Sequence, residues 1–299
     1  MIHFVKFDEK HAALIACLLN EEHAGSDEFI PFDIERVLSE IARHAHHLTV
    51  SLVEEDGKTV GVVATHPEGD TETSIHWLAA QGRSDRVRIE DAIVSSIERT
   101  ACGVSVSTMI DAGSSRIGEW VARGYVLEPG FQRMYRKLDD LISVPSVSDG
   151  VKLRGLRVGE EEKLVALVNA GFEWERLEAG DLEAWKVQDK PFDESWIEVA
   201  ESDGRLVSVV VARPDTEPNR YFHLKRGYLG PAATLPEFRN KHLASALTAK
   251  CMNLLYEKGM DSVRLGTSEL NVASISLLKS LGFQVENVRK ILRKRLESA

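Results

Sequence analysis

The chain repeats one order of elements twice, and this repeat limits its fold more than any other feature. The pairs Asp56-Gly57 and Asp203-Gly204 lie 147 residues apart, each between apolar, β-branched runs. Asp-Gly in that setting predicts a tight hairpin, because Gly accepts the positive φ of the turn. The pairs Gly124-Tyr125 and Gly282-Phe283 recur 158 residues apart and suit the left-handed position that closes a helix. The drifting offset indicates duplication followed by divergence.

The hydrophobic periodicity predicts the same elements in both halves. Two helices come first, at 10–20 and 33–45 in the first half and at 160–170 and 180–187 in the second. After the hairpin we expect a strand, a long helix and a short strand, at 74–79, 86–101 and 104–110, and again at 227–234, 241–258 and 262–266. A last helix and a further strand pair should end each half. The order predicts an α/β (α+β) fold of two tandem domains, each a mixed, mostly antiparallel sheet flanked by helices.

A linker separates the two halves. The stretch LISVPSVSDG at 141–150 has the Pro, Ser and Gly content of an interdomain segment. A length of 299 residues also favours two domains. We expect domains at 1–143 and 151–299, joined by 144–150.

The composition excludes several classes of protein. Hydrophobic residues make up 43% and charged residues 28%, as in ordinary soluble domains. No stretch approaches the roughly 18 apolar residues of a membrane helix, and the first ten residues turn acidic too early for a secretory signal. The three cysteines are too widely spaced for a disulfide framework or paired metal ligands. We expect a cytoplasmic protein, a monomer or homodimer, with no membrane partner.

The net charge of −10 lies in the first half. Residues 1–148 hold 14 Lys and Arg against 24 Asp and Glu, whereas residues 149–299 hold 23 of each. Nucleic acid is not an expected partner, because phosphate binding needs a basic face. A ligand that bears phosphate is better tolerated by the second half.

The most informative motif is GYLGPAATLPEFRNKHLASALTAKCMNLLYEKG at 227–259. It predicts a strand, a Leu-Pro-Glu turn, a basic loop and a helix, with small residues at 244–246 in the first helical turn. The unbonded N–H groups of a helix start form an anion site, and small side chains let a phosphate approach them. Arg239 and Lys241 add positive charge. The pattern favours binding of a pyrophosphate.

Two motifs in the second half resemble those of the GNAT-type N-acetyltransferase superfamily. Residues 233–244 are ATLPEFRNKHLA, similar to the family's acetyl-CoA motif, and residues 271–283 are NVASISLLKSLGF, similar to its second signature. With the strand that precedes them, they span about sixty residues, 227–283, in the family's order. The resemblance implies acetyl-CoA as cosubstrate and a small amine or amino-acid-like acceptor. An altered first half beside an active second half is similar to the layout of mycothiol synthase.

The resemblance also assigns roles to residues. Backbone amides of the loop would cradle the pyrophosphate: Arg239, Asn240, Lys241, His242, Leu243, Ala244 and Ser245. The backbone of Ala233, Thr234 and Leu235 would pair with the pantetheine arm, and Asn271 would lie near the pantetheine or the acetyl group.

Two departures from the family pattern bear on activity. His242 stands where the family usually has Gly, so we expect pyrophosphate binding to survive if φ is negative there. Leu278 stands at the family's frequent general-acid Tyr, and an aliphatic side chain cannot protonate a thiolate. That role is either empty or filled from elsewhere.

Proton transfer in acyl transfer normally uses His, Glu or Tyr. Tyr221, His223 and Tyr228 precede or begin the cofactor strand, and Glu269 follows the next strand. We select Tyr228 and Glu269 as the catalytic candidates.

The resemblance places the acceptor surface on the first two helices and their loop, here 170–186. Phe172, Trp174 and Trp185 either line an apolar pocket there or are core or interdomain contacts.

The first half is expected to have lost the cofactor site. Aligning Ile93 with Leu247 sets Glu90 opposite Ala244, which would put a carboxylate where the pyrophosphate should lie. The alternative is a modified cofactor site that uses Arg83, Arg86 and Arg88.

A metal site is not predicted. His44 and His47 are spaced so that two imidazoles could converge, but no nearby carboxylate or Cys completes a ligand set.

Three functions remain open. The leading one is an acetyl-CoA-dependent N-acetyltransferase working through residues 149–299. The others are a non-catalytic acyl-CoA-binding protein, which His242 and Leu278 would suit, and a protein-interaction module in which both sites are lost.

Overall fold

The computed structural model describes residues 2–26, 28–44, 47–82, 84–101 and 103–296. The chain forms two compact units, unit 1 with residues 1–130 and 288–299, and unit 2 with residues 131–287. The compact units therefore divide at positions other than 144–150, because the last strand of each half crosses from one unit to the other. The repeat domains at 1–143 and 151–299 stay a prediction about the sequence.

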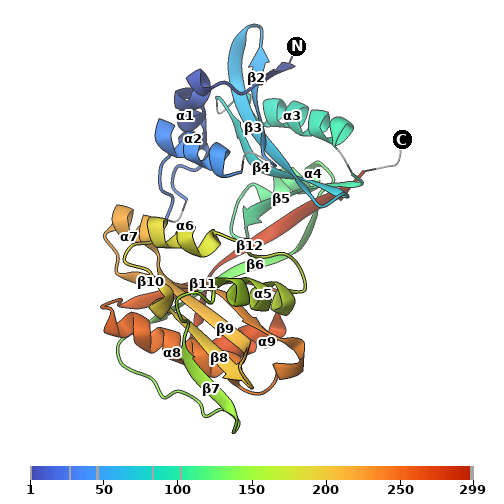
Figure 1. Cartoon of the computed structure of the whole chain (residues 1–299). Helices are drawn as coiled ribbons and strands as arrows, with labels where there is room; N and C mark the ends of the chain where they lie inside the picture. The colour runs from blue at the N-terminus through green and yellow to red at the C-terminus, as the bar shows by residue number, and fades with distance from the viewer. Residues whose placement is uncertain (1, 27, 45–46, 83, 102, 297–299) are drawn as a thin grey trace. The chain divides into compact units, whose positions relative to one another are not determined.

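Unit 1 is a mixed sheet with four α-helices among its described residues (Figure 1). Its strands are β1 (Ile2–Lys6), β2 (Thr49–Glu55), β3 (Lys58–Glu68), β4 (Glu72–Ala80), β5 (Ser105–Asp111) and the end of β12 (Gln284–Arg295). Its helices are α1 (Ala12–Glu22), α2 (Ile34–Arg43), α3 (Arg86–Thr100) and α4 (Ile117–Ala122). The strand order is β1-β2-β3-β4-β5-β12, antiparallel except for the parallel pair β4–β5.

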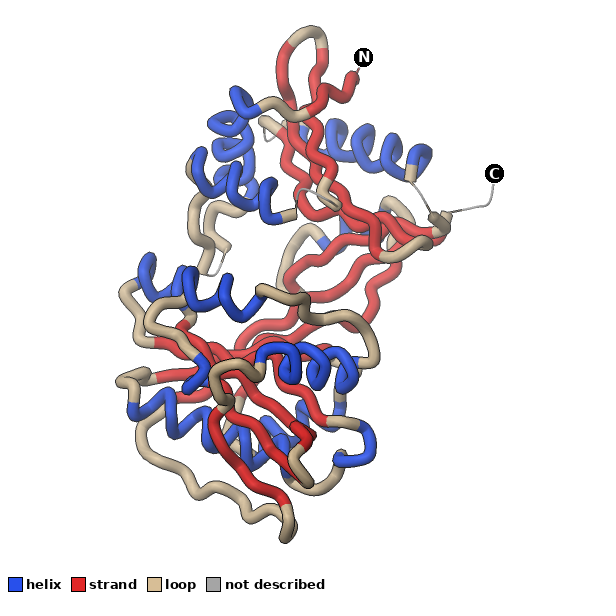
Figure 2. Tube along the Cα trace, viewed as in Figure 1, coloured by secondary structure: helices blue, strands red, loops and turns tan. Residues whose placement is uncertain are grey.

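Unit 2 repeats this plan (Figure 2). Its strands are the end of β6 (Val126–Lys137), β7 (Val151–Gly155), β8 (Ile197–Ser202), β9 (Arg205–Pro214), β10 (Arg226–Thr234) and β11 (Ser262–Ser268). Its helices are α5 (Glu161–Phe172), α6 (Asp181–Gln188), α7 (Thr216–Phe222), α8 (Leu243–Glu257) and α9 (Val272–Ser280). The order is β6-β11-β10-β9-β8-β7, antiparallel except for the parallel pair β10–β11.

Helices cover both faces of the sheet of unit 2. A Cβ at Gly227 would meet the side chain of Leu255, so that face of β10 packs on α8. A Cβ at Gly171, near the end of α5, would meet Ala233, so the opposite face of β10 packs on α5. One apolar core fills the space on the two faces, and Leu278 belongs to it.

The fold predicted from the repeat is confirmed. Asp56-Gly57 and Asp203-Gly204 have positive φ at all four residues, 51°, 74°, 50° and 78°, as the hairpin turns require. The short strands β1 and β7 and the helix α7 were not predicted.

The predicted last strand pair is wrong in both halves. Each half ends in one strand of 12 residues, β6 and β12. Pro129-Gly130 has the composition of a turn, yet it lies inside β6. A Cβ at Gly130 would stand 2.2 Å from the carbonyl oxygen of Arg289, so Gly is needed there for close strand packing.

Among the described residues, no helix is long and apolar enough to cross a membrane.

Candidate acyl-CoA site

Strands β10 and β11 are paired over only part of their length. The parallel register joins Arg226–Tyr228 to Ser262–Arg264. Beyond Tyr228, β10 continues to Thr234 on β9 alone, and β11 continues to Ser268 on β6. Within the described ranges, the β10 edge from 229 to 234 therefore has no β11 partner. Backbone polar groups need partners, so an extended ligand with amide groups would suit this edge.

A β-bulge bends β10 at the same point. The register to β9 shifts between Leu229 and Ala232, where Gly230-Pro231 supply one residue more than the partner strand. A bulge re-aims a strand and ends its regular pairing. Here it coincides with the place where β10 and β11 part.

The loop after β10 leads into α8, and the backbone N–H groups at this junction donate no hydrogen bond within the described residues. Among the described residues, none accepts a hydrogen bond from the backbone N–H groups of residues 240–245, here called the anion loop. Asn240 and His242 both adopt left-handed φ, at 61° and 59°. Successive amides in such a turn at a helix start form a concave anion site.

Pyrophosphate binding was expected to depend on a negative φ at His242, but φ there is positive. His242 takes the left-handed conformation that Gly would take without strain. The loop thus keeps the shape that Gly would give it, at a steric cost from the Cβ of His242.

The basic side chains of this segment are partly engaged. Arg239 Nη2 donates to the carbonyl of Gly171 at 3.0 Å and lies 3.3 Å from the Glu173 carboxylate. Lys241 Nζ lies 4.5 Å above the ring of Phe238. Arg239 ties the loop to the end of α5, so the backbone amides are the main anion donors left.

Of the three residues expected at the pantetheine arm, Ala233 and Thr234 end β10 and Leu235 follows it. The side chains of Ala233 and Leu235 are buried, and Ser208 Oγ lies 3.1 Å from the Ala233 carbonyl and 2.7 Å from Thr234 Oγ1. A cavity of about 450 Å³ borders Leu235, between α5 and the turn at Gly204.

Asn271 is a helix cap in the structure. Its side-chain oxygen accepts the N–H of Ser274 at 3.0 Å at the start of α9. A role beside the pantetheine or the acetyl group stays a prediction.

The catalytic candidates differ in position. Tyr228 is the last β10 residue paired with β11, so it lies where the strands part. Glu269 lies in the turn after β11 and is half-buried. Leu278 is only 4% exposed and packs in the core. Tyr221 and His223 are exposed in and just after α7.

The aromatic residues expected at the acceptor surface divide into two groups. Phe172 and Trp174 pack edge to face, and Trp174 is 56% exposed. Trp185 packs against the core and stacks on Arg213, a residue that sequence reasoning missed. The available signal was a lone Arg at the end of the apolar strand RLVSVVVARP.

The matching helix of unit 1 begins differently. Helix α3 starts at Arg86, four residues before Glu90, whereas α8 starts at Leu243, one residue before Ala244. When the helix starts are matched, Glu90 corresponds to Leu247, so the expected equivalence with Ala244 is wrong by about one turn.

Glu90 is fully buried in an ion network of unit 1. Its carboxylate accepts from Arg86 at 3.2 Å, from Arg116 at 2.7 Å and from Arg123 at 3.2 Å. Arg88 pairs with Glu55. These contacts give Arg86 and Arg88 structural partners, which disfavours a second cofactor site; Arg83 lies outside the described residues.

A cavity of about 570 Å³ lies between α3 and α4 of unit 1, far in the sequence from the anion loop. Its charged lining residues include two ion pairs, Arg123 with Asp91 and Lys294 with Glu98.

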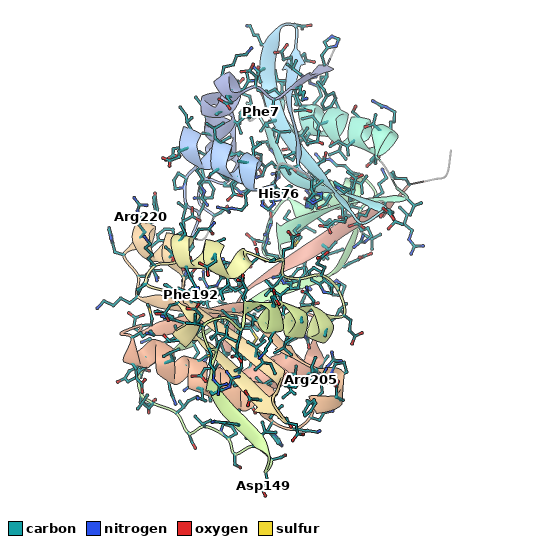
Figure 3. All side chains as sticks on the ribbon, viewed as in Figure 1. Phe7, His76, Asp149, Phe192, Arg205 and Arg220 are labelled. Atoms are coloured by element: carbon teal, nitrogen blue, oxygen red, sulfur yellow. The ribbon has the colours of Figure 1, made fainter. Side chains whose placement is uncertain are left out.

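The His44 imidazole pairs with Glu40 at 3.8 Å, and its ring lies 6.2 Å from that of His76 (labelled in Figure 3). In the part of the chain that is described, no group of three or more His, Cys, Asp and Glu could hold a metal ion.

Comparisons with known proteins relate the second half of the chain to one family. The model of the Acetyltransferase (GNAT) family matches residues 160–283. A mycothiol acetyltransferase of Thermobispora bispora is 29% identical over 164 residues, which are 50% of this chain and 52% of that protein. Another, from Salinispora arenicola, is 27% identical over 274 residues, 85% of this chain and 83% of that protein. The first alignment thus spans about half of the relative's length.

Solved structures show the same architecture over the whole chain. A GCN5-related N-acetyltransferase from Sphaerobacter thermophilus has a TM-score of 0.70 at 17% identity, covering 100% of this chain and 96% of that one. A tandem GNAT protein from the clavulanic acid biosynthesis pathway has a TM-score of 0.68 at 15% identity, covering 100% of both chains. Residues 160–283 of the chain therefore match the GNAT acetyltransferase family, and the whole chain is similar in fold to tandem GNAT structures.

Proposed function

We propose that the chain is an acetyl-CoA-dependent N-acetyltransferase for a small amine or amino-acid-like acceptor, working through unit 2. The observation that carries the proposal is the β10 edge, without a β11 partner among the described residues, followed after one short turn by the anion loop. An edge strand suits the amides of pantetheine, and the loop amides suit a pyrophosphate. The residues present therefore fit acetyl-CoA.

The reaction joins the acceptor amine to the acetyl carbonyl carbon. A C–N bond forms, the C–S bond breaks, and the amine proton ends on the CoA sulfur. Backbone N–H groups near the bulge of β10 would polarise the carbonyl. Tyr228 and Glu269 are the proposed proton carriers, because Leu278 has no ionisable group.

Titration calorimetry with acetyl-CoA on the whole chain tests the cofactor site. We expect one site per chain, and Ala244→Glu should weaken binding at least tenfold, because it adds negative charge and bulk beside the loop amides. Ala244→Ser is the matched control, since it keeps a small neutral side chain, and it should bind as the parent does. Equal affinity of the Glu variant and the parent would refute the site.

A thiol-release assay over a panel of amines tests catalysis. The buried Leu278 also suits a protein that binds acyl-CoA without turnover. Tight acetyl-CoA binding with no thiol release from any amine would favour that second function.

A further inference from the structure

A polar row crosses the sheet of unit 2 where β10 and β11 part. Tyr228 is in register with Arg213 of β9 and with Arg264 of β11, and Arg264 is in register with Tyr135 of β6. Cross-strand partners share a face of the sheet, so these four side chains, here called the polar row, lie in line. They lie on the face opposite α8, where Trp185 of α6 stacks on Arg213.

Arg213 is held rigidly. Its guanidinium carbon lies 4.6 Å from the ring centre of Trp185 and 5.8 Å from that of Tyr228. Its Nη1 donates to Asp189 Oδ2 at 3.0 Å. Stacking and an ion pair fix the plane of the guanidinium, so little entropy remains to be lost on binding a ligand.

One donor of Arg213 is unspent. The Nε atom is buried and has no acceptor among the described residues, although the side chain is 21% exposed overall. A buried N–H without a partner costs free energy, which a ligand oxygen that reaches it would recover.

Two glycines leave room at the hydroxyl of Tyr228. A Cβ at Gly230 would lie 3.9 Å from that oxygen, and a Cβ at Gly266 would lie 4.0 Å from it. Neither position carries a side chain, so a ligand can approach the phenol from these sides.

Arginines lie on and beside the row. Arg213 pairs with Asp189, and Arg264 and Arg133 lie 2.7 Å and 3.7 Å from Glu286. Arginine is the side chain best shaped for a carboxylate.

We propose that Arg213 is the specificity residue for the acceptor, and that the acceptor is an amine that bears a carboxylate. The proposal rests on the proposed function, and names the substrate class of the same site. With its carboxylate on Arg213, an amino acid would hold its amine beside Tyr228, at the end of the unpaired β10 edge.

Kinetics with matched acceptors test the proposal. Each amino acid of a panel is compared with the amine of the same side chain that lacks the carboxylate. Arg213→Met, which keeps an unbranched stem, should raise KM at least tenfold for the amino acid and change KM less than twofold for the amine. Arg213→Lys should recover part of the loss, because it keeps the charge. Arg220→Met, on the exposed helix α7, is the control and should change neither.

Two kinetic outcomes would overturn the proposal: an equal rise in KM for both acceptors, and a parent protein without preference for the acceptor that bears the carboxylate. Folding of each variant is checked by circular dichroism. Acetyl-CoA calorimetry distinguishes failure of the Arg213 proposal from failure of the proposed function. Arg213→Met should bind acetyl-CoA as the parent does. Thermal stabilisation by the amino acids without acetyl-CoA reports on Arg213 even if no thiol is released. Loss of that stabilisation in Arg213→Met supports the proposal, and its retention refutes it.

Discussion

At the scale of single residues, His242 combines a side chain with a backbone that disfavours one. A non-glycine residue in the left-handed region costs about 1–2 kcal/mol, and Gly in turn loses about 0.5–1 kcal/mol of backbone entropy on folding. At the φ of 59° that His242 adopts, Gly should therefore give a slightly more stable fold than His.

We expect His242→Gly to raise the free energy of unfolding, measured by urea denaturation, by about 0.5–1 kcal/mol. The affinity for acetyl-CoA should stay unchanged. His223→Gly, at φ 56° after α7, is a control with the same backbone away from the anion loop. A weaker affinity in His242→Gly alone would mean that the imidazole itself contacts the ligand.

The lowered pKa of Glu160 predicts that unit 2 loses stability at low pH. Hydrogen bonds from Arg154, at 2.7 and 2.9 Å, lower the pKa of the Glu160 carboxyl from 4.5 to about 2. A lowered pKa in the folded state stabilises the protein above pH 4.5, and this stabilisation is lost as the pH falls from 4.5 to about 2. Glu160→Gln should melt at a lower temperature than the parent at pH 7. Its melting temperature should also fall less than that of the parent between pH 4.5 and about 2. Parallel curves for the two proteins would contradict the assignment.

At the scale of elements, helix α5 sets the position of strand β10. A Cβ at Gly171 would lie 2.9 Å from the Cβ of Ala233 and 3.3 Å from the backbone nitrogen of Thr234. Helix and strand therefore touch along their backbones at the β10 edge.

Gly171→Ala should destabilise the protein by about 1–3 kcal/mol, because the added methyl group overpacks this contact. It should also weaken acetyl-CoA binding, since β10 must shift. Gly118→Ala is the matched control: it adds a methyl group to helix α4 where nothing lies within 4 Å. Chemical denaturation and calorimetry of the two variants check the pair, and an unaffected Gly171→Ala would show that β10 tolerates displacement.

Much of the element pattern follows from local sequence. The amphipathic runs of α1, α5 and α8 and the Asp-Gly hairpins are set by which residues must be buried and by φ at the turns. The motif of the anion loop could be located for the same reason. The bulge at Gly230 and the stack of Trp185 on Arg213 depend on pairing and packing between distant segments, so the sequence alone did not predict them. The left-handed φ of His242 is a property of the loop itself, and its signal in the sequence was a His where the family usually has Gly.

At the scale of the whole molecule, the compact units predict which fragments fold. Residues 131–137 of β6 pair with all of β11, Ser262–Ser268, inside unit 2. A fragment of residues 151–299 lacks that strand, and its β11 edge is left open. An open edge favours aggregation.

We expect residues 131–287 to form a folded, monodisperse fragment and residues 151–299 to aggregate. Circular dichroism and size-exclusion chromatography compare the two fragments. Cooperative melting of the 151–299 fragment would show that β6 is dispensable and would restore the boundary at 144–150.

The crossing strands also impose an order on synthesis. Unit 1 places residues 289–295 of β12 beside β5, so its sheet is completed by residues that are translated only after unit 2. Until residues 289–295 are made, β5 has one unpaired edge, whereas β6 can already pair with β11 in unit 2. A premature stop codon at position 288 would therefore damage unit 1 and spare unit 2.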